Sequence, residues 1–134
     1  MAMAKRILVF NDAQEVLHLF GEILRDAGYE AILTSYGTDD LERVRGARPD
    51  LLIVDFPPLT REESGWQLVQ KLKMSRDTEH IPIVLCTTNL RAIQDTQGWL
   101  TSKKIATVPK PFTVDELLHA VEGQLKEHAG ECHR

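Results

Sequence analysis

Five short apolar runs alternate along the chain with segments that have helical periodicity. The runs span 7–10, 29–33, 51–54, 81–86 and 105–108, and three of them are almost wholly apolar. Continuous apolar runs of this length are typical of parallel strands that are covered on both faces. The alternation therefore predicts an α/β fold, a doubly wound, five-stranded parallel sheet with helices on both faces.

The first two helical segments carry recognisable start and stop signals. Residues 13–27 place their apolar side chains on one helical stripe, and Gly28 supplies the stop. Thr38, followed by two aspartates, is expected to open a second helix, because hydroxyl and carboxylate oxygens accept hydrogen bonds from the first helical N–H groups. That helix must end before Pro49.

Three further helices are expected. A third is predicted over 65–74, opened by its glycine, and a poorer one over 91–100, which Gly98 interrupts. Thr113 and Glu116 have the spacing of a capping box, in which each side chain accepts a hydrogen bond from the other residue's backbone N–H. They are predicted to open the last helix.

Length and composition limit the classes of function. A chain of 134 residues suits one domain, predicted here over 5–127, with a disordered tail over 128–134. A net charge of −4 argues against a nucleic-acid surface. No segment has the roughly 20 apolar residues of a membrane span. Two cysteines and the absence of a secretion signal favour a reducing cytoplasm.

Polar residues follow the apolar runs at the positions where the strands end. Asp12 follows the first run, Asp55 ends the stretch DLLIVD, Thr87 follows the fourth run and Lys110 comes just after the fifth. Open parallel sheets bind ligands outside the carboxyl ends of their strands, where the strand order reverses. In the flavodoxin-like order 2-1-3-4-5 the first and third strands are neighbours, so Asp12 and Asp55 should meet.

Two neighbouring carboxylates repel each other unless a cation lies between them or one is protonated. Mg²⁺ prefers a few carboxylates plus water and is therefore the predicted metal. The hydroxyl of Thr87 and the ammonium of Lys110 would complete a site for a phosphoryl group, with Asp55 as an acceptor that forms an aspartyl phosphate. Taken singly, Asp12 and Thr87 could cap helices, and Lys110 could be a surface lysine. The prediction depends on all four together.

These residues resemble the receiver domain of two-component response regulators. The matching pieces are ILVFND, DLLIVD, IPIVLCTT and VPKPF, which occur in this order. The resemblance implies that Asp55 accepts phosphate from a phosphohistidine on a sensor histidine kinase or histidine phosphotransfer protein. It implies that Asp12, Asp55 and the backbone carbonyl of Pro57 bind Mg²⁺, and that Thr87 and Lys110 contact phosphoryl oxygens. The output would be binding to a downstream protein target, with no direct contact to nucleic acid or membrane.

The sequence departs from the family's pattern at two site positions. Asn11 stands where the family usually has a second acidic residue, so it could contact the metal only through a water, and Mg²⁺ should bind more weakly. Thr107 stands where the family usually has an aromatic residue that rotates on activation. The family usually holds the Lys110–Pro111 peptide bond in the cis form, which the sequence permits.

Two other classes of function stay open. One is a receiver-like interaction module that acts independently of phosphorylation, as Asn11 and Thr107 would allow. The other is an enzyme on the same architecture, a Mg²⁺-dependent phosphatase or a flavin carrier. Such phosphatases usually place a second aspartate where this chain has Pro57. The favoured prediction is a signalling switch and not an enzyme, apart from slow autodephosphorylation. The oligomeric state, the kinase and the output target are left open.

Overall fold

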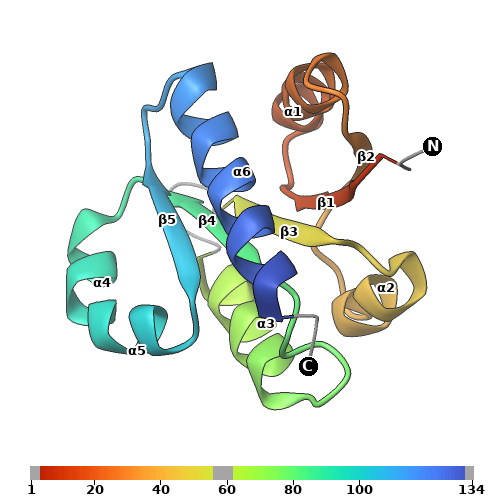
Figure 1. The fold of residues 1–134 in the computed structure, drawn as a ribbon. Helices are drawn as coiled ribbons and strands as arrows, with labels where there is room; N and C mark the ends of the chain where they lie inside the picture. The colour runs from red at the N-terminus through yellow and green to blue at the C-terminus, as the bar shows by residue number, and fades with distance from the viewer. Residues whose placement is uncertain (1–3, 56–61, 132–134) are drawn as a thin grey trace.

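The computed structural model describes residues 4–55 and 62–131. Strands and helices alternate along these residues, except that two consecutive helices precede the last strand, and the strands form one central sheet (Figure 1). The elements are β1 (Arg6–Phe10), α1 (Gln14–Asp26), β2 (Glu30–Thr34), α2 (Asp40–Ala47), β3 (Leu51–Asp55), α3 (Glu62–Met74), β4 (Ile83–Thr87), α4 (Leu90–Asp95), α5 (Gln97–Ser102), β5 (Ile105–Pro109) and α6 (Val114–Glu131).

The sheet has five strands in the order β2-β1-β3-β4-β5, and every neighbouring pair is parallel. This is the predicted flavodoxin-like order. Strand bounds differ from the predictions by one or two residues. The largest difference is in β4, which begins at Ile83 and not at Ile81. Pro82 has no N–H to give to the ladder, although its carbonyl accepts the Leu52 N–H at 2.9 Å.

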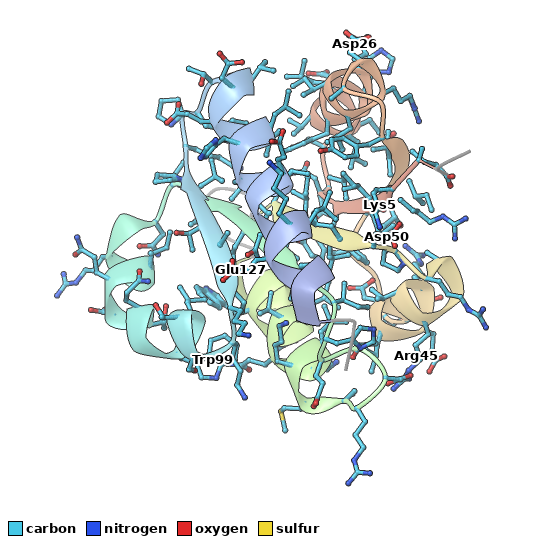
Figure 2. The ribbon with its side chains drawn as sticks, in the orientation of Figure 1. Lys5, Asp26, Arg45, Asp50, Trp99 and Glu127 are labelled. Atoms are coloured by element: carbon cyan, nitrogen blue, oxygen red, sulfur yellow. The ribbon has the colours of Figure 1, made fainter. Side chains whose placement is uncertain are left out.

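Alternate residues along each strand face opposite layers of helices, so the sheet separates two apolar cores. Helices α1 and α6 cover one face and form the first core with it, and α2, α3, α4 and α5 cover the other face and form the second core. Figure 1 shows α6 in front of the sheet and α3 on its far side. Trp66 and Trp99 are half-buried at the edge of the second core; Trp99 is labelled in Figure 2. Burial on both faces explains why the strands read as continuous apolar runs.

Two helices begin at other residues than predicted. Helix α2 begins at Asp40, with Asp39 at its N-cap, so Thr38 does not open it. The Asp40 carboxylate instead accepts the Gly37 N–H at 2.8 Å. Helix α3 begins at Glu62, which places Gly65 within its first turn rather than at its start. Each prediction relied on one local signal, and the ends of a helix are the positions that such a signal places least precisely.

The predicted helix over 91–100 is two short helices. The break between α4 and α5 is at Thr96, the N-cap of α5, and Gly98 lies inside α5. An isolated glycine lowers helix stability by about 1 kcal/mol without necessarily ending a helix. Helix α1 does end as predicted, with Gly28 in the left-handed region at φ +93°.

The predicted capping box at the start of α6 is confirmed. Thr113 N–H donates to Glu116 Oε1 at 2.8 Å, and Glu116 N–H donates to Thr113 Oγ1 at 3.1 Å. The backbone of 128–131 belongs to α6, so the described part of the predicted tail is helical, with no proline there to stop the helix. Among the described residues, no helix combines the length and apolar character needed to cross a membrane.

Candidate phosphoryl-acceptor site

The site lies at the carboxyl edge of the sheet. Asp12 follows β1, Asp55 ends β3, Thr87 ends β4, and Lys110 follows β5. These strands are consecutive neighbours in the order β1-β3-β4-β5, so the topology brings all four residues to one edge. Asp55 lies opposite Cys86 in the ladder between β3 and β4, one residue before Thr87. The structure therefore gathers the predicted residues as the sequence analysis expected.

Asp55 is a fully buried carboxylate with a cationic partner. Its relative exposure is 0%, and the Lys110 Nζ atom lies 2.6 Å from its Oδ1. Its Oδ2 accepts a short hydrogen bond from the side-chain amide of Asn11. Burial raises the pKa of Asp55, while Lys110 and then Asn11 act in the opposite direction. The net effect is a carboxylate that is harder to ionise than one in water.

Asn11 is buried and has both ends of its amide engaged. Its Oδ1 accepts the Ala13 N–H at 2.6 Å, while its Nδ2 donates to the Asp55 side chain and lies 3.5 Å from the Asp55 backbone oxygen. The Ala13 N–H requires an acceptor, which fixes the orientation of the amide. Asn11 thus presents a donor to Asp55, where an aspartate would present a second negative charge. The predicted water-mediated contact of Asn11 with a metal stays a prediction.

Asp12 is half-buried and points toward the loop after β2. Its Oδ1 accepts the Tyr36 N–H at 3.2 Å. Asp12 is not the N-cap residue of α1, because Ala13 occupies that position. Its carboxylate is instead held at the edge of the sheet, beside the strand that ends in Asp55.

Thr87 and Lys110 are linked through the backbone. The Lys110 N–H donates to the Thr87 carbonyl at 2.9 Å, which joins the ends of β4 and β5. The buried Thr87 hydroxyl accepts the Asn89 N–H at 3.0 Å. The Lys110–Pro111 peptide bond is cis, as the resemblance implies. Thr87 and the ion-paired Lys110 therefore lie on the side of Asp55 opposite to Asp12.

The donor set fits a magnesium ion in its chemistry. Asp12 and Asp55 supply carboxylates from adjacent strands, and Mg²⁺ in proteins usually keeps one or two carboxylates and several waters. Within the described ranges there is no group of three or more His, Cys, Asp and Glu that could hold a metal. Pro57, whose carbonyl is the third predicted protein ligand, lies outside the described residues.

Tyr36 contacts Asp55, and the sequence did not predict this contact. Its hydroxyl donates to the Asp55 backbone oxygen at 3.1 Å, and its ring stacks on Phe10 with centroids 5.5 Å apart. The sequence signal was its place just after β2, at the same edge as the other site residues. Nothing in the sequence indicates that the ring turns inward.

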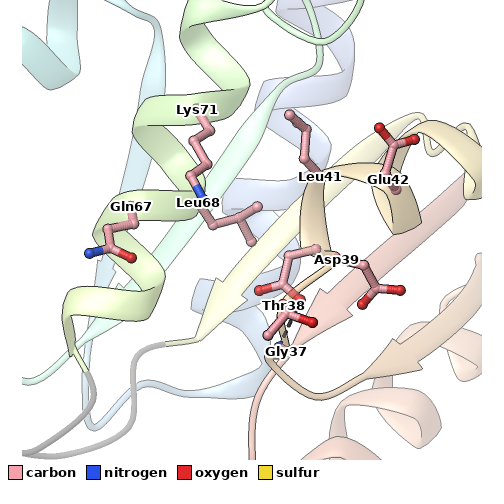
Figure 3. A pocket seen from close by; sticks show the side chains of 9 residues that line it. Gly37, Thr38, Asp39, Leu41, Glu42, Gln67, Leu68 and Lys71 are labelled. Carbon is pink, nitrogen blue, oxygen red and sulfur yellow. Dashed lines mark hydrogen bonds between the residues drawn. The ribbon is translucent and has the colours of Figure 1, made fainter.

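A separate pocket lies beside the site. It has a volume of about 280 Å³ and is formed by the 37–42 segment and by Gln67, Leu68 and Lys71 of α3 (Figure 3). It begins at the residue after Tyr36 but does not include Asp12, Asp55, Thr87 or Lys110. The candidate site is thus distinct from this pocket.

Comparison with known proteins shows the family of the chain. The family model for the response regulator receiver domain matches residues 7–122. The polar-differentiation response regulator DivK of Brucella anthropi is 27% identical over 123 residues, which cover 92% of this chain and 98% of DivK.

Solved structures agree in fold. Chemotaxis protein CheY4 of Vibrio cholerae is 25% identical, with a TM-score of 0.73 over 92% of this chain and 99% of CheY4. A CheY-like response regulator receiver domain protein from Methanospirillum hungatei has a TM-score of 0.76 at 22% identity, over 96% of this chain and 98% of its own. At that identity the likeness concerns the fold alone.

Proposed function

The chain belongs to the response regulator receiver domain family, and from this premise we propose that it is a signalling switch that accepts a phosphoryl group on Asp55. Receiver domains of this family act in two-component signalling. The observation that carries the proposal is the buried Asp55 carboxylate at the carboxyl edge of the sheet, with Lys110 Nζ at 2.6 Å from one of its oxygens. Burying a charge costs stability unless the charge is fully paired and hydrogen-bonded, so a carboxylate kept in this position points to a function.

The proposed reaction is transfer from a phosphohistidine. A carboxylate oxygen of Asp55 attacks the phosphorus atom, the phosphorus–nitrogen bond breaks, and the imidazole leaves with the electron pair of that bond and takes up a proton from water to become neutral. The products are an aspartyl phosphate and free histidine. Lys110, already 2.6 Å from Asp55 Oδ1, would contact the phosphoryl oxygens and stabilise their negative charge.

Thr87 and Asp12 have complementary roles in the proposal. The Thr87 hydroxyl accepts a hydrogen bond from Asn89 N–H, which leaves its own proton available to a phosphoryl oxygen. Asp12, Asp55 and the carbonyl of Pro57 would hold Mg²⁺. The ion would neutralise charge on the phosphoryl oxygens.

The proposed partners follow from the family. Receiver domains interact with histidine kinases or histidine phosphotransfer proteins and with downstream protein targets, and we propose both kinds for this chain, in the cytoplasm. The phosphorylated state would bias an existing conformational equilibrium. Slow hydrolysis of the aspartyl phosphate would return the switch to its starting state.

Labelling with acetyl phosphate tests the proposal. The protein is incubated with radiolabelled acetyl phosphate, with and without Mg²⁺, beside Asp55→Asn and the exposed-site control Asp26→Asn. We expect Mg²⁺-dependent labelling of the unaltered protein and of Asp26→Asn, and none of Asp55→Asn. Absence of label from the unaltered protein, or equal label on Asp55→Asn, would contradict the proposal.

A second candidate is an interaction module that acts independently of phosphorylation. It is favoured by the Asn11 amide, which already donates to Asp55 Oδ2, and by Thr107 in place of an aromatic residue on β5. Affinity for a partner that is the same in the unaltered protein, in Asp55→Ala and after acetyl phosphate treatment would support this candidate over the switch.

A further inference from the structure

Tyr36 reaches the phosphoryl-acceptor site from a strand that is not adjacent to β3. It follows β2, the edge strand, and β1 lies between β2 and β3. The ring crosses the end of β1 by stacking on Phe10, its last residue, with an interplanar angle of 28°. This side chain therefore spans the carboxyl ends of three strands.

Two hydrogen bonds connect Tyr36 to the two carboxylate-bearing segments. Its backbone N–H donates to Asp12 Oδ1 at 3.2 Å, and its hydroxyl donates to the Asp55 backbone oxygen at 3.1 Å. The first bond orients the Asp12 carboxylate. The second holds the peptide group that joins Asp55 to the segment carrying Pro57.

We infer that Tyr36 is a positioning residue for phosphoryl transfer, which sets Asp55 and Asp12 relative to each other through its hydroxyl and its backbone N–H. The inference rests on the proposed function. In-line attack on phosphorus requires the carboxylate to be held in a narrow range of positions, and a misplacement of about 1 Å can cost on the order of a hundredfold in rate. The hydroxyl acts on the backbone of Asp55, so it acts through Asp55 and not on the phosphoryl group.

Tyr36→Phe isolates the hydroxyl, because the ring and its stacking on Phe10 remain. We expect the rate constant for labelling by acetyl phosphate at saturating Mg²⁺ to fall about tenfold. Circular dichroism and thermal melting give the folded fraction, to which the rate is normalised. Tyr29→Phe is the matched control, since Tyr29 precedes β2 at its other end and packs against the opposite core.

A second control separates positioning from stability. Gln124 Nε2 donates to the carbonyls of Ile83 and Lys104 at 2.8 and 2.9 Å, at the amino ends of β4 and β5 and far from the site. Gln124→Ala should lower the melting temperature while leaving the labelling rate of the folded protein unchanged.

The outcomes distinguish the inference from the function on which it rests. No label on the unaltered protein would overturn both. Label on the unaltered protein at the same normalised rate as on Tyr36→Phe would overturn the inference alone. A rate loss in Gln124→Ala as large as that in Tyr36→Phe would also overturn the inference, because lower stability would then explain both losses. A loss confined to Tyr36→Phe supports the positioning role.

Discussion

Asp55 carries a negative charge in a place that the fold shields from water. Lys110 forms an ion pair with its carboxylate and Asn11 donates a hydrogen bond to it, yet burial is the larger effect and the pKa of Asp55 is raised. A carboxyl whose pKa is higher in the folded than in the unfolded state favours folding when it is protonated. The ionised form therefore costs stability, and this cost decreases as the pH falls below the folded-state pKa and is absent below the unfolded-state pKa.

Replacing this charge should stabilise the protein. In metal-free buffer at neutral pH, we expect Asp55→Asn to raise the free energy of unfolding, because the neutral amide avoids the desolvation cost of the buried carboxylate. The amide keeps the shape of the side chain, and Lys110, with 22% of its side chain exposed, can turn to water. Urea denaturation measures the change. The control Asp26→Asn, at the surface, should change the free energy of unfolding by less than about 0.5 kcal/mol. If Asp55→Asn were less stable than the unaltered protein, the buried charge would not be destabilising.

Lys73 is a second buried charge, far from the site. Its ammonium donates to the carbonyls of Glu79 and Ile81 at 2.9 and 3.1 Å, and only 6% of the residue is exposed. Burial, and next the charge of Lys103, lowers the pKa of Lys73 to about 8. Between this value and the usual pKa near 10.5, the unfolded chain binds more protons at Lys73 than the folded chain.

The stability of the unaltered protein should therefore rise with pH relative to Lys73→Met. The gain should develop between about pH 8 and pH 10.5, at up to about 1.4 kcal/mol per unit of pKa separation. Urea denaturation of both proteins across this window measures the difference. Lys71→Met removes an exposed lysine of the same helix and should show no such change. If the difference in free energy of unfolding between the two proteins stayed constant or fell with pH, burial would not disfavour the charged form of Lys73.

At the scale of elements, the capping signals of two helices had different outcomes. Thr113 makes both bonds of its box at the start of α6, whereas Thr38 lies outside α2. We expect Thr113→Ala to lower the free energy of unfolding by about 1 kcal/mol, and Thr38→Ala to change it by less than about 0.5 kcal/mol. Chemical denaturation checks both, and equal losses would show that the observed caps do not govern stability.

The elements that sequence predicted well are those with a strong, repeated signal. Apolar runs covered on both faces identified every strand, and Pro82 accounts for the one start that was misplaced by two residues. The region 91–100 was predicted as one continuous helix because a polar sequence carries little information about where a helix breaks. The structure divides it at Thr96, and Ile93 of α4 and Leu100 of α5 both lie in the second core.

At the scale of the whole molecule, topology explains why the candidate site could be found from sequence. Parallel strands end at one edge, so residues after separate runs had to meet there once the order was assumed. The contacts of Asn11 and Tyr36 with Asp55 could not be predicted in this way, because they depend on side-chain direction. Both contacts are made by residues that depart from, or add to, the pattern of the family.

The most direct test of the account asks where the phosphoryl group is attached. The protein is treated with acetyl phosphate and Mg²⁺ and reduced with borohydride, which converts an aspartyl phosphate to homoserine, and peptides are then sequenced by mass spectrometry. The account predicts homoserine at position 55 and at no other aspartate. Intact Asp55 together with homoserine elsewhere, or no conversion at any aspartate, would contradict it.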